Sequence, residues 1–504
     1  MNGAVRAGKV IITALVVTAG LCSAAQAGGQ DEASGGRGPR SREAKNIILF
    51  IGDGMQLEHE IAASRYLHGR DFGLAWHDLG YRAAVTTWDV TTYNARAATL
   101  GAAPYSPESF EPTIGYDPAL GGKRPFPADT TGSDAYFLTT MKATDSASAA
   151  TAWATGHKTD DGNIAWLPGD PEGGALRTIA ELVREDKHRS IGVVSTVPFT
   201  HATPAAHVSH NVSRNNYLAI ADEIIRDVQP EVVIGGGFPA SGNFRYLSES
   251  LYQEVKEGIV DEYVFVERAA GVDGGLILAD GAGQALASGK KLFGLFGGAD
   301  GNLISPVPAD SPRFPAIARG AVEDPLLVDS TRAALKVLSA DRDGFFLMVE
   351  QGDIDWANHA NDFARMIGCV WDLDLAVRSA IDFVNQPGDR VDWSNTLLIV
   401  TSDHGNSYMR LVLDDSATPR LGLGDLPRQV ANSVPVGGYT PGFVYPEGEI
   451  TYGSGSHTNE LVTFYARGQG VNQFARRQGA WYPRTQLLDN TQLFEAMAAA
   501  SGLR

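Results

Sequence analysis

A serine that could act on phosphorus stands where a helix is expected to begin. Residues 144–156 are rich in alanine and hydroxyl-bearing side chains, and Thr144 and Asp145 are candidate N-caps ahead of a good helix-forming run. Ser146 would then occupy the first turn, where unpaired backbone N–H groups and the helix dipole favour an anion. Its hydroxyl could attack phosphorus or hold a phosphoryl group. For this stretch alone, a capped surface helix is an equally good interpretation.

Further polar side chains follow apolar, β-branched runs of the kind that form buried parallel strands. These side chains are Asp53, Thr203, Glu350, Asp403 and His404. The carboxyl ends of parallel strands meet at one edge of a sheet, so we expect these groups to lie close together. A cluster with so many carboxylates would repel itself unless cations were bound in it, which indicates a metal site.

Two more stretches contribute metal-binding residue types. Asp355 and His359 are four residues apart and would share one face of a helical turn, a spacing that suits one metal ion. His457 lies in a Gly/Ser loop ahead of an apolar run. Alone, a loop histidine is usually only solvated.

The pattern of elements predicts how these residues are positioned. Apolar runs indicate strands at 46–51, 190–196, 232–234, 345–349, 397–401 and 461–466, and helical patterns cover 176–185, 217–227 and 367–383. Strands that alternate with helices indicate an α/β fold with a large, mostly parallel, doubly wound sheet flanked by helices. The Gly-, Pro-, Tyr- and Thr-rich regions near 89–139 and 405–455 carry none of these signatures. We interpret them as insertions, or a small crown subdomain, that decorate the site or make subunit contacts.

The N-terminus has the pattern of a secretory signal. A basic start, an apolar run too short to span a bilayer and a small-residue cleavage site predict a signal peptide at 1–27. Residues 28–44 are Gly-, Ser- and charge-rich and are expected to be a disordered lead-in, which leaves 45–504 for the catalytic domain. Export predicts a periplasmic or secreted protein.

Charge and cysteine content limit the possible partners and stabilising devices. The net charge of −18 argues against nucleic acid and against anionic membrane surfaces. Of the two cysteines, only Cys369 remains after the predicted cleavage, so the mature chain has no intramolecular disulfide. Bound metal is a candidate for the missing stabilisation.

Taken together, these motifs resemble the alkaline phosphatase family over essentially the whole mature chain. The matching motifs are TDSxxxATAxxTG around Ser146, IGDGM at Asp53, HATPAAHVSHNVSR ending at Arg214, VEQGDIDWANH ending at His359, TSDHG at His404 and HTNE at His457. Each motif is weak alone, but six in the right order are a specific signal.

The resemblance implies a role for each matching residue. Ser146 would be the nucleophile that becomes a phosphoserine, and Arg214 would clasp the substrate phosphate. Asp355, His359 and His457 would bind one zinc, and Asp53, Asp403 and His404 a second. Asp53 would bridge to a magnesium that Thr203 and Glu350 also hold. The family implies two Zn²⁺ and one Mg²⁺ per subunit, hydrolysis of small phosphate monoesters at alkaline pH, and a homodimer.

Two positions depart from other members of the family. Residue 201 is histidine where others carry aspartate, and residue 356 is tryptophan where others carry lysine or histidine. His201 is therefore a candidate ligand at the third metal site, which it would shift from Mg²⁺ towards Zn²⁺ or Co²⁺. His207 and His210 lie nearby in the sequence and are interpreted as supporting the site without binding metal.

Other functions remain open from the sequence. On the same metal-dependent fold the chain could be a phosphodiesterase, a phosphonate hydrolase, a sulfatase or a phosphoglycerate mutase. Ser146 directly after Asp145, together with Arg214, favours monoesters. A non-catalytic exported phosphate- or metal-binding protein would not need a nucleophile at the position of Ser146.

Overall fold

A computed structural model describes residues 43–125, 133–309, 316–388, 390–411 and 450–503. The predicted signal peptide and nearly all of the predicted lead-in lie outside these residues. Of the lead-in, Glu43 and Ala44 are described, and Ala44 is buried and donates a backbone hydrogen bond to Ala500 (2.8 Å). Much of the insertion predicted near 405–455 also lies outside the described residues.

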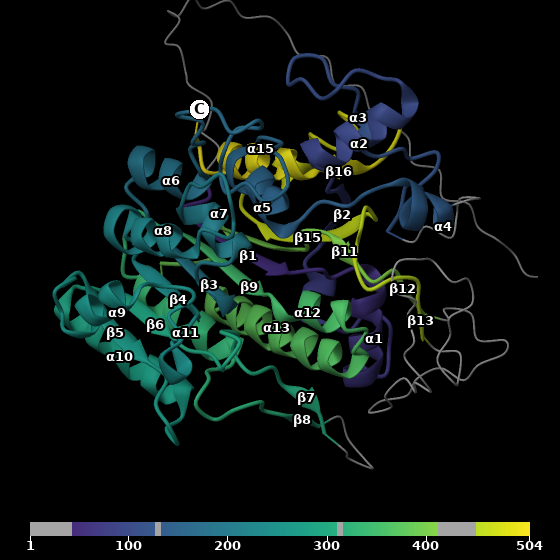
Figure 1. The fold of residues 1–504 in the computed structure, drawn as a ribbon. Coiled ribbons are helices and arrows are strands. Elements are labelled where there is room, and N and C mark those ends of the chain that lie inside the picture. The colour runs from purple at the N-terminus through teal and green to yellow at the C-terminus, as the bar shows by residue number, and fades with distance from the viewer. Residues whose placement is uncertain (1–42, 126–132, 310–315, 389, 412–449, 504) are drawn as a thin grey trace, which may run out of the picture. The chain divides into compact units, whose positions relative to one another are not determined.

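A mostly parallel sheet forms the centre of the described chain, as the sequence predicts (Figure 1). From one edge to the other its ten strands are β16 (Leu487–Asp489), β2 (Tyr81–Thr86), β15 (Val462–Gly468), β10 (Thr396–Thr401), β1 (Asn46–Gly52), β9 (Phe345–Gln351), β3 (Ser190–Pro198), β4 (Val232–Gly236), β6 (Lys291–Leu295) and β5 (Tyr263–Glu267). Only β15 runs antiparallel to its two neighbours within this sheet. Short two-stranded ladders join β7 (Val307–Pro308) to β8 (Ile317–Ala318), β11 (Gly405–Asn406) to β14 (His457–Thr458), and β12 (Met409–Leu411) to β13 (Ile450–Tyr452).

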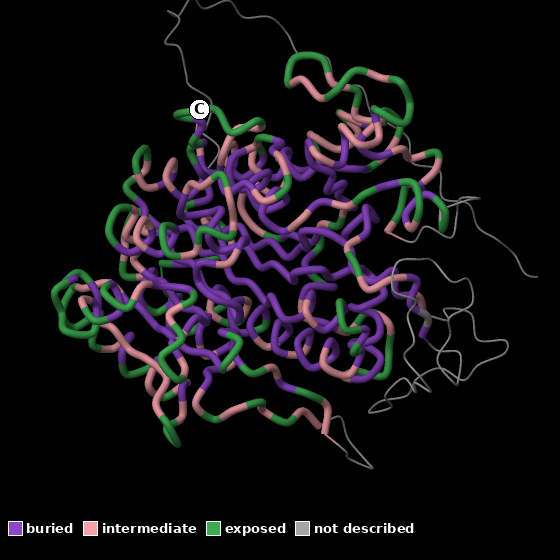
Figure 2. Tube along the Cα trace, viewed as in Figure 1, coloured by how far each residue is buried: buried purple, intermediate pink, exposed green. Residues whose placement is uncertain are grey.

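Both faces of the sheet are buried under helices, because alternate residues of each strand point to opposite sides. In β1, Ile48 and Phe50 belong to one apolar core while Ile47, Leu49 and Ile51 belong to the other. Figure 2 shows this buried centre running along the strands.

The helices divide into two sets by the core that they join. The first core includes residues of α1 (Leu57–His68), η1 (Ala75–Asp78), α10 (Gly274–Ser288), α11 (Leu327–Leu338), α12 (Asp353–His359) and α13 (Phe363–Val384). The second includes residues of α5 (Ser146–Thr155), α6 (Ile179–Lys187), α7 (Ala202–Val208), α8 (Tyr217–Asp222), η4 (Glu223–Val228), α9 (Glu249–Lys256), α14 (Asn472–Ala475) and α15 (Asn490–Ala500). The short η5 (Ala240–Gly242) lies in a loop after β4. None of the described helices is both long and apolar enough to cross a membrane.

The region near 89–139 forms a small aromatic core of its own. Its helical elements are α2 (Val90–Leu100), α3 (Pro112–Gly115), α4 (Ser133–Ala135) and η3 (Tyr136–Thr140). Trp88 and Phe137 belong to this third cluster, and the rings of Phe137 and Tyr408 lie 6.2 Å apart. The contact joins this region to the chain that follows β10.

Two predicted helices differ from the observed ones for local reasons. The helix predicted from 176 begins at Ile179, because Thr178 and Glu181 form a reciprocal capping box that fixes its first turn. The helix predicted over 217–227 is α8 followed directly by a π-helical turn, η4. Neither difference moves a candidate site residue.

His210 anchors the segment between α7 and α8 to the neighbouring helices. Its Nδ1 lies 2.8 Å from Glu223 Oε1 in η4, and its Nε2 lies 3.3 Å from Glu181 Oε2 in α6. Burial alone would lower the pKa of His210, but hydrogen bonds to the two carboxylates outweigh it and raise the pKa to about 10. A charged His210 therefore ties down the chain that leads to Arg214.

This ion triad predicts a loss of stability at alkaline pH. A histidine whose folded-state pKa is raised stabilises the fold fully below its unfolded pKa, roughly 6.5. That stabilisation declines as pH rises and is lost above about 10. The thermal midpoint of the wild type should fall over this range, and that of His210→Gln should fall less. His188→Gln, at an exposed position that ends α6, is the control and should keep the wild-type profile. If the thermal midpoints of the wild type and His210→Gln fall equally with pH, His210 does not stabilise the fold as a charged group.

Candidate functional site

Four neighbouring strands deliver the predicted metal-binding residues to one edge of the sheet. β10, β1, β9 and β3 are consecutive in the sheet order, and Figure 1 shows β1, β9 and β3 side by side. Asp403 and His404 follow β10, Asp53 follows β1, Glu350 lies near the end of β9, and Thr203 lies in α7 just after β3. The predicted meeting of these residues at the carboxyl ends of the strands is therefore observed.

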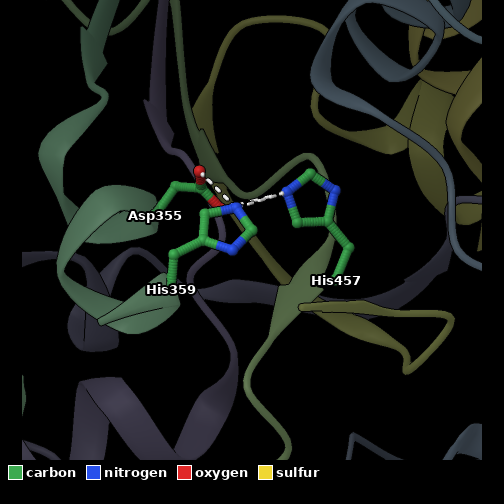
Figure 3. Close-up of side chains that lie close together, drawn as sticks. All are labelled: Asp355, His359 and His457. Carbon is green, nitrogen blue, oxygen red and sulfur yellow. Dashed lines mark hydrogen bonds and ion pairs between the residues drawn. The ribbon is translucent and has the colours of Figure 1, made fainter. Parts of the chain in front are cut away.

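Asp355, His359 and His457 form the first cluster (Figure 3). His359 Nε2 lies 3.2 Å from Asp355 Oδ2, and His457 Nε2 lies 3.3 Å from Asp355 Oδ1 and 3.1 Å from His359 Nε2. The Nδ1 atoms face backbone carbonyls, those of Gly455 for His359 (2.8 Å) and of Thr144 for His457 (2.9 Å). These carbonyls accept the Nδ1 hydrogens, so both Nε2 lone pairs point to one place.

Asp53, Asp403 and His404 form the second cluster, which is fully buried. His404 Nε2 lies 3.1 Å from Asp403 Oδ2 and 3.6 Å from Asp53 Oδ1. The backbone N–H of Gly54 donates to Asp403 Oδ1 (2.8 Å) and fixes the orientation of that carboxylate. The other carboxylate oxygen of Asp403, Oδ2, is thereby left free to bind a metal ion.

Asp53, Glu350 and Thr203 lie together at the predicted third metal site. Burial raises the pKa of Glu350 to about 7, against the hydroxyls of Ser195 and Thr203, which lower it. Burial also raises the pKa of Asp53 well above its usual range, and the charges of Asp403, Asp355 and Glu350 raise it further. The fold thus holds carboxylates where they disfavour one another's ionisation.

The residues at all three positions fit bound metal cations. Asp53 Oδ1, Glu350 Oε1 and Asp403 Oδ2 are buried, and none has a hydrogen-bond donor among the described residues. A buried carboxylate oxygen without a donor is costly, and a cation removes that cost. Two histidines with a carboxylate suit zinc, as do two carboxylates with a histidine, whereas carboxylate and hydroxyl oxygens alone suit magnesium.

Ser146 stands in the first turn of α5, as predicted. Asp145 caps this helix by accepting the backbone N–H of Ser148 at Oδ1 (2.9 Å). The Oγ of Ser146 lies 3.3 Å from His404 Nε2, and the residue is only 3% exposed. The structure therefore places this hydroxyl at the second cluster, next to the N-terminus of a helix.

Arg214 reaches the site through Asp145, a contact that the sequence analysis missed. Its Nη1 donates to Asp145 Oδ2 (3.0 Å), and its Nη2 lies 3.3 Å from His201 Nε2. Burial and the charge of Arg214 lower the pKa of His201 to about 3, so this imidazole is neutral. No local pattern links Asp145 to Arg214, which is 69 residues away along the chain.

Two other acidic side chains support the start of α5. Asp89 and Asp161 lie close enough to Asp145 to form a group of three carboxylates. Ser148 Oγ donates to Asp89 Oδ2 (2.8 Å), and the backbone N–H of Asp145 donates to Asp161 Oδ1 (3.2 Å). The protein's own donors thus already bind this group, which we interpret as a scaffold for Ser146.

The remaining nearby polar residues hold their neighbours in place. His207 is fully buried, with its Nδ1 2.9 Å from the carbonyl of Thr203, and belongs to neither histidine-containing cluster. Asn406, which the sequence analysis did not single out, donates to Asp355 Oδ1 (2.6 Å). Only the position of Asn406, two residues after His404, could have indicated from the sequence that it lies near the site.

Comparison with known proteins shows which family the chain resembles. The family model described as alkaline phosphatase matches residues 123–244 and 283–421, together just over half of the chain. Alkaline phosphatase 3 of Bacillus subtilis is 30% identical over 367 residues, which is 72% of this chain but only 61% of the relative. The chain spans 49% of alkaline phosphatase 4 from the same organism. The alkaline phosphatase of Escherichia coli K12 is 29% identical, over 92% of this chain and 87% of the relative.

Solved structures give the same fold. The alkaline phosphatase of Thermus thermophilus superposes with a TM-score of 0.60 at 23% identity, over 92% of each chain. That of the Antarctic bacterium TAB5 has a TM-score of 0.57 at 20% identity, over 92% of this chain and 99% of that one. By its fold and its matching family model, this chain belongs to the alkaline phosphatase family.

Proposed function

We propose that this protein hydrolyses phosphate monoesters at alkaline pH through a phosphoserine on Ser146 and releases inorganic phosphate. The observation that carries the proposal is the position of Ser146 Oγ, 3.3 Å from His404 Nε2 at the N-terminus of α5. A binding protein has no need for a hydroxyl beside a metal cluster at a site that favours anions.

Each chemical step has a residue suited to it. The Ser146 hydroxyl gives up its proton as Oγ attacks phosphorus, the bond to the alcohol oxygen breaks, and that oxygen takes up a proton as the alcohol leaves. Water then attacks the phosphorus, the bond to Oγ breaks, Oγ regains a proton and inorganic phosphate is released. Metal ions at the two histidine-containing clusters would supply Lewis acidity for both displacements. Arg214 can bind two non-bridging phosphate oxygens in a fork, and its bond to Asp145 holds the guanidinium beside the nucleophile.

We propose two Zn²⁺ and one Mg²⁺ as the full complement of metals. Zinc would be held by Asp355, His359 and His457 and by Asp53, Asp403 and His404, with Mg²⁺ at Asp53, Thr203 and Glu350. The contact with Arg214 engages Nε2 of His201, while Nδ1 of His201 is buried and has no hydrogen-bond partner in the part of the chain that the structure describes. A neutral imidazole there gives the third site one negative charge fewer than aspartate would. A TAB5 alkaline phosphatase variant with histidine replaced by aspartate has Mg bound in its M3 site.

The cellular setting follows from the sequence and the family. The signal predicted at 1–27 supports export to the periplasm or the medium, and family resemblance supports a homodimer. One relative of similar length, from Streptomyces griseus, is a streptomycin-6-phosphate phosphatase, 27% identical over 99% of this chain. The substrate could therefore be an organic monoester with a large alcohol.

Removing the metals should destabilise the protein. Chelation with EDTA should lower the thermal midpoint, because bound ligand contributes about 2.7 kcal/mol per site at 100 times its Kd. Its removal also leaves the buried carboxylates uncompensated. Dithiothreitol alone should have no effect, since Cys369 is free and buried. A thermal midpoint that responds to reductant but not to EDTA would refute this account.

The metal content should differ between the wild type and a variant at position 201. Metal analysis after reloading should give two zinc ions, and His201→Asp should retain more Mg²⁺ on dialysis than the wild type.

Removing the nucleophile should abolish the covalent intermediate. Ser146→Ala should lose labelled phosphate incorporation at low pH and lower kcat by on the order of 10³-fold or more, with metal content intact. Ser148→Ala is the matched control, because its hydroxyl bonds the supporting carboxylates Asp89 and Asp145 and contacts neither histidine-containing cluster; it should still form the intermediate. Incorporation that persists in Ser146→Ala would show that another group is the nucleophile.

Removing the phosphate clamp should weaken binding more than turnover. Arg214→Ala should raise KM and the inhibition constant of inorganic phosphate, by roughly 1.5–3 kcal/mol in binding free energy, since the lost hydrogen bonds join charged groups. Arg214→Lys keeps the charge but not the fork and should recover part of the loss. Arg177→Ala, which removes an exposed guanidinium paired with Glu185, is the control and should change the inhibition constant little. An unchanged constant in Arg214→Ala would place Arg214 outside the site.

A further inference from the structure

A cavity of about 660 Å³ opens beside the first metal cluster. His359 and His457 line it on one side, and so do Thr144 and Asp145, the two residues before Ser146. The side chains of His359 and His457 converge on Asp355 at this place (Figure 3). The cavity is within the size range of sites that bury small organic molecules.

The cavity lies where an ester's alcohol group would leave. Ser146 Oγ is at His404, in the second cluster, and neither residue lines the cavity. In an in-line displacement the attacking and leaving oxygens are on opposite sides of phosphorus, held by different metals in a two-metal site. With Ser146 at the second cluster, the leaving oxygen falls at the first, beside this cavity.

We propose that this cavity binds the alcohol part of the substrate and selects monoesters with a bulky apolar, aryl-containing alcohol. The inference rests on the proposed function and adds a substrate class to it. Phe137, Leu138 and Met141 supply an apolar wall, and the loop around Gly453–Ser456 faces them with small residues. The lining also carries Lys142 and Asp161, which are exposed and opposite in sign, and Asp145, whose charge is paired with that of Arg214, so no unpaired charge of one sign dominates the cavity.

Contacts on both sides hold this apolar wall in place. Phe137 packs in the aromatic core of its region and contacts Tyr408, whose hydroxyl donates to Asp134 (2.5 Å). Gly453 leaves the room that the wall needs, because a Cβ there would lie 3.0 Å from Leu138 Cδ1 and 2.8 Å from the Tyr408 ring. Leu138 is half-buried, so it has apolar surface to offer a ligand.

A pair of esters with the same kind of leaving oxygen tests the proposal. Butyl phosphate and 4-phenylbutyl phosphate are both primary alkyl esters, so a difference in kcat/KM reports on binding of the phenyl group. We expect the zinc-loaded wild type to favour the phenylbutyl ester by roughly tenfold or more, as burial of an aromatic side chain does. The matching phosphonates, which cannot be hydrolysed, should show the same order in their inhibition constants.

Leu138→Ser should reduce this preference by roughly threefold or more, because it removes apolar contact from the wall. Leu100→Ser is the matched control: Leu100 is 53% exposed in the same region but does not line the cavity, so the preference should be unchanged. If Leu138→Ser does not fold, the order of the wild-type phosphonates decides.

Two outcomes separate this proposal from the proposed function. If both esters are hydrolysed at equal kcat/KM, or if Leu138→Ser keeps the full wild-type preference, the cavity does not select the alcohol while the hydrolase function stands. If neither ester is hydrolysed by the zinc-loaded protein, the proposed function itself fails, and the substrate class with it.

Discussion

The site depends on buried carboxylates that cannot all be charged together without cations. Asp53, Glu350, Asp355 and Asp403 are almost completely buried at one edge of the sheet. Burial raises the pKa of Asp53, and the charges of the other three raise it further. Desolvation and repulsion between carboxylates thus both oppose ionisation of Asp53 and Glu350. The free energy of binding metal ions must therefore offset the free-energy cost of burying these carboxylates together. Metal binding and stability of the native state are therefore one property of this protein.

The apolar sheet makes this arrangement rigid. Strands β10, β1, β9 and β3 are buried on both faces, so their pairing is fixed by two cores at once. Each strand can then end in polar residues without losing its register. Backbone groups complete the alignment: Gly54 orients Asp403, and carbonyls of Gly455 and Thr144 orient His359 and His457. The groups that orient these side chains are thus backbone amides and carbonyls, which take no part in the proposed chemistry.

Asp145 joins Ser146, the proposed nucleophile, to Arg214, the proposed phosphate clamp. One of its oxygens caps α5, which fixes Ser146, and the other accepts from Arg214. The segment that carries Arg214 is in turn held by His210 between Glu181 and Glu223. A substitution at Asp145 would thus disturb both the hydroxyl and the guanidinium. The same helix start borders the cavity to which we assign the alcohol. In the proposed mechanism one helical turn therefore contacts the nucleophile, the phosphate clamp and the leaving-group cavity.

The sequence by itself determined which residue types meet at the candidate site and much of the local structure. Residue types at the ends of apolar runs, the cap at Asp145 and the helical spacing of Asp355 and His359 depend on near neighbours, which a sequence displays. Only the tertiary structure decided which strands are adjacent, that Asp145 binds Arg214, and that Asn406 supports Asp355. It also decided that Leu138, in a region interpreted as an insertion that decorates the site or makes subunit contacts, lines a cavity beside His359. These contacts join residues far apart along the chain, and packing of the whole molecule selects them, so no local pattern could have predicted them.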